Sequence, residues 1–166
     1  DQDVSDLVSL FVPQLYRSCI LRQEWLQDKL EWYMLDGLFQ SVISFYFPYL
    51  IFYIGFNNPQ GLMLHHRFWM GTVVACLSVT ACNIYVMLKQ FRWDWLSVLI
   101  NVISILLVYF WTGVWSVRVY SAQEFFKAGA QVFGTLLCWC AIFIGVLLCV
   151  LPRFTIDTFK RYFRPR

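Results

Sequence analysis

Four apolar stretches, nearly free of charged side chains, constrain the fold of this chain more than any other feature. They cover approximately residues 32–54, 68–88, 95–115 and 132–151. A helix of about 20 residues crosses the roughly 30 Å hydrocarbon core of a bilayer, where each backbone polar group has to be satisfied within its own segment. The sequence therefore predicts an all-α fold, an integral membrane region with four membrane-spanning helices.

The overall composition agrees with a surface that lipid covers. Only 14% of the residues are charged and 60% are hydrophobic, whereas a soluble domain carries about 25% charged residues. So few charges cannot cover a surface that faces water. The net charge of +3 is small and scattered along the chain, so we expect no nucleic-acid partner.

The residues outside the four stretches are predicted to form two flanks. Residues 1–31 combine an acidic start with an apolar face that includes Leu21 and Leu26, as in an amphipathic helix at the cytosolic membrane interface. Residues 152–166 form a basic cytosolic tail, and their interleaved aromatic side chains suit a short interfacial helix. The chain starts at Asp1 rather than Met and shows no signal-peptide pattern, so we expect it to be a piece of a longer polypeptide.

Lysine and arginine near the ends of the stretches predict the orientation. Cytosolic loops of membrane proteins carry an excess of these residues. On one side of the predicted membrane lie Arg17, Arg22, Lys29, Lys89, Arg92, Arg153, Lys160, Arg161, Arg164 and Arg166, and on the other lie only Arg67, Arg118 and Lys127. The richer side is expected to be cytosolic, which puts both ends of the chain in the cytosol.

Small residues recur at helical spacing within each stretch, and we predict that they form the interfaces of the helix bundle. Helices in lipid pack through such residues because close approach of the backbones replaces the hydrophobic effect. The alternative is that Asn83 and Asn101 line a polar pathway. The predicted packing residues are Gly37, Ser41, Ser44, Gly71, Ala75, Ser78, Asn101, Gly134, Ala141 and Gly145.

Ion binding within the membrane is not expected. Ion pumps and proton relays need carboxylates inside the spans, whereas Asp36 lies near the start of the first stretch and the middle of each stretch has none. Cys138 and Cys140 are two residues apart and point to different sides of a helix. The sequence therefore predicts no metal site.

The basic tail offers candidate contacts for anionic lipid. A basic residue near the anionic cytosolic leaflet contributes about 1 kcal/mol of attraction. An ordinary positively charged flank, without a specific lipid site, is the alternative. The candidate residues are Arg153, Lys160, Arg161 and Arg164.

Four short motifs, in this order and spacing, resemble one family. They are DQDVSD at 1–6, VPQLYR at 12–17, LDGLFQS at 35–41 and LPRF at 151–154. Together they resemble the stretch that follows the sixth membrane helix of type-IV P-type ATPases, which are phospholipid flippases, and most of all the fungal Dnf type. The resemblance covers essentially the whole chain and implies that the four spans are helices seven to ten of a ten-helix transmembrane domain.

The resemblance also implies a function. The family couples ATP hydrolysis to the movement of phospholipid from the exoplasmic to the cytosolic leaflet, with Mg²⁺ and ATP as cofactors and an aspartate phosphorylated in a DKTGT motif. This motif is absent from the 166 residues. We therefore expect no catalytic, cofactor-binding or metal-binding residues in this segment, which instead supports the transport helices.

Partners and location follow from the same resemblance. The late helices of the family help to hold a glycosylated two-span β-subunit, for which residues 56–67, 116–131 and the last span are candidate contacts. The implied location is the plasma membrane or the Golgi and endosomal membranes. The alternatives to a flippase segment are a free-standing four-span channel subunit or scaffold, and a membrane-bound enzyme that uses Asp1 and Asp3.

Overall fold

Helices make up the regular elements in the described part of the protein. The computed structural model describes residues 6–21, 27–55, 61, 63, 66–90, 93–117 and 125–163. Four long helices run through them, α3 (Gln27–Tyr53), α4 (Arg67–Lys89), α5 (Trp95–Val117) and α7 (Leu136–Phe163). The short elements are α1 (Asp6–Phe11), the 3₁₀ helix η1 (Pro13–Tyr16), α2 (Arg17–Ile20) and α6 (Ala128–Phe133).

The four long helices are long and apolar enough to cross a membrane. The segments that meet this condition within the described residues are Lys29–Tyr53, Arg67–Lys89, Trp95–Val117 and Leu136–Lys160. The all-α fold class predicted from the sequence is therefore confirmed, and the protein is an integral membrane protein.

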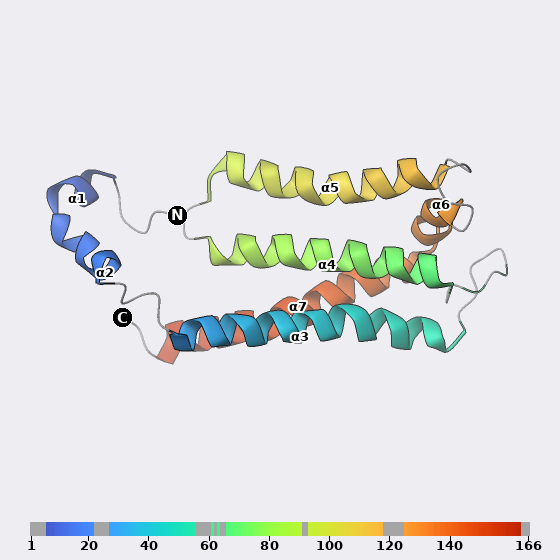
Figure 1. Ribbon diagram of the computed structural model, residues 1–166, viewed down its shortest axis with the longest axis horizontal. Coiled ribbons are helices and arrows are strands. Elements are labelled where there is room, and N and C mark those ends of the chain that lie inside the picture. Colours follow the sequence, from blue (N-terminus) through green and yellow to red (C-terminus); the bar gives the residue numbers. More distant parts are fainter. Residues whose placement is uncertain are drawn as a thin grey trace.

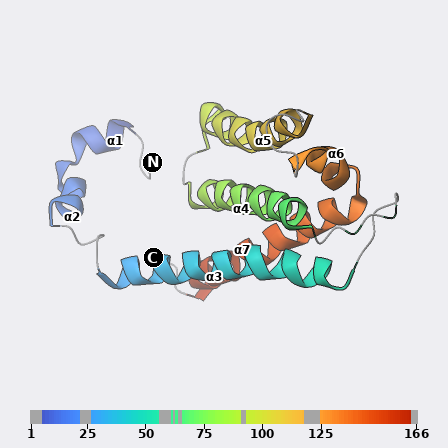
Figure 2. The ribbon, with the colours of Figure 1, turned by 45° about the vertical axis from the view of Figure 1, so that its right-hand side comes forward.

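The long helices lie side by side, with α4 at the centre of the bundle (Figures 1 and 2). Helix α4 packs against α3, α5 and α7, and α3 packs against α7 as well. Helix α6 lies across one end of the bundle, where it contacts α4 and α5. The opposite end gathers the start of α3, the end of α4, the start of α5 and the end of α7 (Figure 1).

The N-terminal segment differs from a continuous amphipathic helix. Helices α1 and α2 are short and stand away from the bundle (Figures 1 and 2). Leu21 is exposed there, whereas Arg22 and Leu26 lie outside the described residues. Val12, just before Pro13, has φ −122° and ψ 76°, outside the helical region. Proline disfavours the helical conformation of the residue before it, and α1 and η1 are separated here.

The last span begins later and ends later than the apolar stretch 132–151. The helix is interrupted between α6 and α7 at Gly134 and Thr135. A side chain at position 134 would meet the carbonyl oxygen of Ala130 at 2.6 Å, so the break requires glycine here. Apolar content alone did not reveal this break, because the residues on both sides of it are equally apolar.

Helix α7 also continues through the residues predicted as a separate tail helix. Pro152 lies inside α7, which ends only at Phe163. Proline removes one hydrogen bond from a helix, but neighbouring turns and helices can accommodate the carbonyl that this frees in a membrane protein. The described part of the basic tail is therefore the last part of the fourth long helix.

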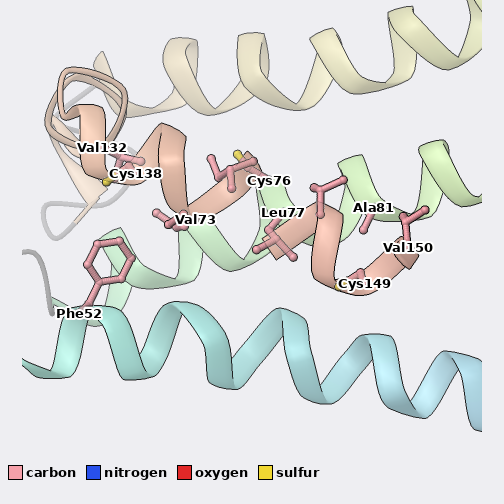
Figure 3. Packing of buried hydrophobic residues seen from close by; sticks show 12 residues of the cluster. Phe52, Val73, Cys76, Leu77, Ala81, Val132, Cys138, Cys149 and Val150 are labelled. Carbon is pink, nitrogen blue, oxygen red and sulfur yellow. The ribbon is translucent and has the colours of Figure 1, made fainter. Parts of the chain in front are cut away.

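The core lies where α3, α4 and α7 meet, and α6 closes one end of it (Figure 3). Phe52 of α3 and Leu77 of α4 are fully buried, as are Cys76, Cys138 and Cys149. Cysteine acts here as a small apolar residue that lets the helices approach closely. The side chains of this core are small for a helix bundle, which brings α7 close to α4.

Candidate functional site

Five polar side chains converge at the end of the bundle where α3 begins and α4 and α7 end. They come from three helices, as Asp36 of α3, Tyr85 and Lys89 of α4, and Arg153 and Asp157 of α7. Arg153 and Asp157 are four residues apart, so one helical face of α7 presents both. Lys89 is the last residue of α4, and Asp36 lies in the third turn of α3. We call these five residues the interhelical charge cluster.

The interhelical charge cluster links the three helices through ion pairs and a hydrogen bond. Arg153 Nη1 lies 3.3 Å from Asp36 Oδ2, and Arg153 Nε lies 3.5 Å from Asp157 Oδ2. Lys89 Nζ forms a further ion pair with Asp157 Oδ2. The hydroxyl of Tyr85 donates a hydrogen bond to Asp36 Oδ2 over 2.9 Å. Each of the two carboxylates therefore has partners on another helix.

Charge within the cluster balances, because two carboxylates face two cations. The side chain of Arg153 is only 16% exposed and that of Asp36 20% exposed. Charges removed this far from water need partners, since an unpaired ion at the edge of hydrocarbon is costly. The guanidinium of Arg153 also lies 5.5 Å from the centre of the Tyr33 ring, at cation–π distance.

One buried donor of the cluster remains incompletely satisfied. Arg153 Nε is buried and has no hydrogen bond among the described residues, although Asp157 lies at ion-pair distance. Such a group in a native structure calls for an explanation, for example an acceptor that binds from outside. Arg153 also lines a cavity.

This cavity, of about 370 Å³, opens beside the cluster at the same end of the bundle. It is lined by the two cations Lys89 and Arg153 and the carboxylate Asp157, together with an indole, an amide and two hydroxyls. Such a lining fits a small polar group that carries an acceptor oxygen, held at the edge of the membrane. Its lining residues are Tyr85, Leu88, Lys89, Gln90, Trp93, Arg153, Phe154, Asp157 and Thr158.

The residues proposed to contact anionic lipid differ in their surroundings. Arg153 is committed to Asp36 and Asp157, so it does not extend freely from the helix. Lys160 is exposed on the last turns of α7. The side chain of Arg161 and the whole of Arg164 lie outside what the structure describes.

The predicted packing residues divide into those that face other helices and those that do not. Ser44, Asn101 and Ala141 are buried. Gly145 is buried against α4, because an added side chain would overlap Leu77 and would meet Phe47 at 3.2 Å. Ser78 is half-buried, Gly134 marks the break before α7, and Gly37, Ser41, Gly71 and Ala75 are exposed within this bundle.

The two asparagines predicted as a possible polar pathway each donate a hydrogen bond to the backbone of their own helix. Asn83 donates a hydrogen bond to Val79 O over 2.9 Å, and Asn101 donates one to Ser97 O over 2.8 Å. Among the described residues, no group of three or more histidine, cysteine or acidic side chains is arranged to hold a metal ion. Cys138 is buried and Cys140 exposed, so the two thiols face different surroundings.

Sequence reasoning missed the interhelical charge cluster. Asp36 was recognised as an interfacial residue, but its partners lie far along the chain. The available signal was the pair Arg153 and Asp157 at i and i+4, directly after an apolar stretch. Acidic and basic residues at the same predicted membrane depth are candidates to pair, and that rule would have connected Asp36, Lys89 and Arg153.

Comparison with known proteins identifies the relatives of this chain. All of residues 1–166 match the family described as phospholipid-translocating P-type ATPase C-terminal. The phospholipid-transporting ATPases DNF1 and DNF2 of Saccharomyces cerevisiae are 51% and 50% identical over 99% and 100% of this chain. The phospholipid-transporting ATPase DNF1 of Chaetomium thermophilum is 41% identical over 97% of it.

The chain covers only 10% of the length of each of these three relatives. A match over the full chain, with about half of the residues identical to two relatives, leaves one assignment: the chain belongs to the C-terminal family of phospholipid-translocating P-type ATPases.

Proposed function

We propose that these 166 residues form the C-terminal membrane support region of an ATP-driven flippase that moves phospholipid from the exoplasmic to the cytosolic leaflet. The observation that carries the proposal is the match of the whole chain to relatives named phospholipid-transporting ATPases. Because the chain covers 10% of their length, the rest of the polypeptide would bind ATP and Mg²⁺ and carry out the phosphorylation chemistry.

The role of this part is support rather than catalysis. Its interhelical charge cluster joins α3, α4 and α7 at one end, and the buried core joins them along their length. Both arrangements favour a bundle that holds its shape while neighbouring parts of the enzyme move. An exchange of partners within the cluster would need two ion pairs to break, which opposes separation of these helices.

Both ends of this segment are proposed to be cytosolic. The start of α3 and the end of α7 lie at the same end of the bundle, as an even number of crossings requires (Figure 1). The interhelical charge cluster lies at that end, together with the exposed Lys160. An excess of basic residues on this side agrees with a cytosolic position.

The proposed partner is a glycosylated two-span β-subunit, and the proposed location is the plasma membrane or the Golgi and endosomal membranes. Candidate contacts are residues 56–67 and 116–131 and the outer face of the last span. Of these, α6 is well anchored, since Gly129 fits against Ser116 with no room for a side chain. An anchored helix at the exoplasmic end offers a rigid contact for a partner.

Anionic lipid is proposed to contact the cytosolic end through Arg153, Lys160, Arg161 and Arg164. The cavity beside Arg153 and Lys89 supports this proposal, because both cations line it. Lys160 lies exposed about two turns farther along α7. The lipid would meet a headgroup-sized cavity and then a basic surface.

The experiment that tests the proposed function uses the full-length protein purified together with its partner. Hydrolysis of ATP is measured with a panel of single phospholipids, and transport is followed with labelled lipid in the exoplasmic leaflet of vesicles. The proposal expects at least one phospholipid to raise ATP hydrolysis and to disappear from that leaflet. Hydrolysis that no phospholipid stimulates, together with no lipid movement, would refute it.

A further inference from the structure

Helix α5 lies at the edge of the bundle, on the side of α4 that faces away from α3 (Figures 1 and 2). Its main contacts are with α4 and α6. Gly129 of α6 leaves no room for a side chain against Ser116 of α5. The hydroxyl of Tyr109 lies 3.3 Å from the hydroxyl of Thr80 on α4, at hydrogen-bond distance. One side of α5 is therefore held against the bundle, and the opposite side is exposed.

The side chains of α5 are sorted by type between these two sides. Every small or polar residue of the helix is buried or half-buried, whereas the exposed positions carry leucine, isoleucine, valine, phenylalanine and tryptophan. Helices in lipid pack through small residues and interhelical hydrogen bonds. The exposed side offers neither, so it is suited to acyl chains. The residues on the packed side are Ser97, Asn101, Ser104, Tyr109, Thr112, Gly113 and Ser116.

Tryptophans lie at both ends of the exposed side. Trp95 is the first residue of α5. Near the other end, Trp111 and Trp115 are stacked, with ring centres 5.4 Å apart and planes 22° apart. Tryptophan favours the headgroup layer of a bilayer, because its ring is apolar and its indole nitrogen is polar. These tryptophans belong to a set of exposed residues at intervals of four, which we call the α5 row: Trp95, Leu99, Ile103, Leu107, Trp111 and Trp115.

The spacing of the tryptophans is comparable to the thickness of a bilayer. Trp111 and Trp115 follow Trp95 after four and five steps of the α5 row, which places them about 24 Å and about 30 Å farther along an α-helix. The hydrocarbon core of a bilayer is about 30 Å thick on average, a few Å less in the endoplasmic reticulum and a few Å more in the plasma membrane. Tilt of the helix shortens the thickness that it spans. The α5 row therefore fits a core no thicker than the average one.

We propose that the α5 row is a lipid-facing surface that keeps the protein at a preferred bilayer thickness. Acyl chains lie against Leu99, Ile103 and Leu107, and the tryptophans lie in the two headgroup layers. A thicker bilayer draws indole rings into hydrocarbon, and a thinner one moves apolar side chains into the headgroups. Because α5 packs against α4 and α6, tilting it to relieve the mismatch disturbs both contacts. The inference concerns the lipid that surrounds the protein, so it goes beyond the proposed transport function.

Exchanging one leucine and one tryptophan of the α5 row tests this inference without changing the composition. In the double variant Leu107→Trp/Trp115→Leu the paired tryptophans lie one step deeper, which shortens the row by about 6 Å. The full-length protein is placed in vesicles made from phosphatidylcholines with progressively longer acyl chains, and the midpoint of heat unfolding is measured in each. The unchanged protein should have its highest midpoint at an intermediate chain length, and the double variant should have it at a shorter one.

A matched exchange on the same exposed side provides the control. Ile103→Leu/Leu106→Ile keeps two exposed apolar residues apolar and should leave the optimal chain length unchanged. A midpoint that does not depend on chain length, or an optimum that Leu107→Trp/Trp115→Leu does not move, would overturn the inference. Phospholipid-stimulated ATP hydrolysis is measured in the same vesicles. Since unfolding requires no transport, failure of the proposed function would be visible separately.

Photochemical crosslinking provides a second measurement that does not require the double variant to fold. Phe110, which is exposed, is replaced by the photoreactive residue p-benzoyl-phenylalanine in one version. Val108, which packs against the buried core, is replaced in a control version. After irradiation in vesicles, the main product should be a lipid adduct at position 110 and a crosslink within the bundle at position 108. A crosslink to any polypeptide as the main product at position 110 would contradict a lipid-facing α5 row.

Discussion

Replacing Gly145 with alanine should destabilise the bundle, because α7 leaves no room for a side chain against α4 at this residue. A single added methyl group would overlap the side chain of Leu77 and would meet Phe47 at 3.2 Å. Leu77 is fully buried, so moving its side chain disturbs other residues of the core. Overpacking of a well-packed core costs about 1–3 kcal/mol, which corresponds to a change of roughly 5- to 150-fold in the unfolding equilibrium.

A second glycine provides the matched control. An added side chain at Gly71 of α4 would meet nothing within 4 Å, and the residue is exposed. Since alanine favours the helix over glycine, Gly71→Ala should leave stability unchanged or raise it by up to about 1 kcal/mol. Both variants delete a helical glycine, so a difference between them reports the packing of α7 against α4.

The assay is unfolding of the full-length protein in mild detergent, followed by heat or by titration with sodium dodecyl sulfate. Gly145→Ala should unfold at a lower midpoint than the unchanged protein, and Gly71→Ala should not. Combining Gly145→Ala with Leu77→Ala removes the side chain that the new methyl group overlaps, so the double variant should be more stable than the sum of the two single losses predicts. Equal midpoints for Gly145→Ala and Gly71→Ala would refute the close approach of α7 to α4.

Two further predictions concern polar contacts. Asp157→Asn and Lys89→Gln, made singly and together, form a double-mutant cycle in the same unfolding assay. The coupling energy between the two residues should be about 1 kcal/mol at most, since both side chains are roughly one-third exposed. This coupling energy should decrease as salt is added. Trp139→Phe keeps a ring but removes the indole N–H that donates to Phe133 O over 2.8 Å. It should lower the unfolding midpoint by an amount equivalent to about 1 kcal/mol, whereas the control Trp111→Phe should not. Identical midpoints for both variants would show that this hydrogen bond does not stabilise the junction between α6 and α7.

The four long helices were predictable because crossing a membrane depends on local composition. Helix α5 (Trp95–Val117) contains the whole apolar stretch 95–115, and no distant contact is needed to decide what that stretch forms. The break at Gly134 and the continuation of α7 past Pro152 were not predictable in the same way. Both depend on particular hydrogen bonds and contacts, such as that of Trp139 with Phe133, which composition does not reveal.

The candidate site was less accessible from sequence than the fold. Spacing identified small residues on each helix, but it could not distinguish Gly145, which packs against α4, from Gly71, which faces outward. That distinction depends on how the helices cross, and the crossing of helices in lipid is determined by the close packing of their side chains. The interhelical charge cluster was hidden for the same reason, because Asp36 and Arg153 meet only after three helices have assembled.

The separation of those two residues along the chain also has a consequence for biosynthesis. Asp36 enters the membrane with the first span, and its counter-charge Arg153 follows only at the end of the last one. Lys89 likewise lacks its partner Asp157 until α7 has been made. A nascent chain that stops short of α7 therefore presents unneutralised charge at the membrane edge, and a quality-control system able to sense such charge would distinguish unfinished molecules from complete ones.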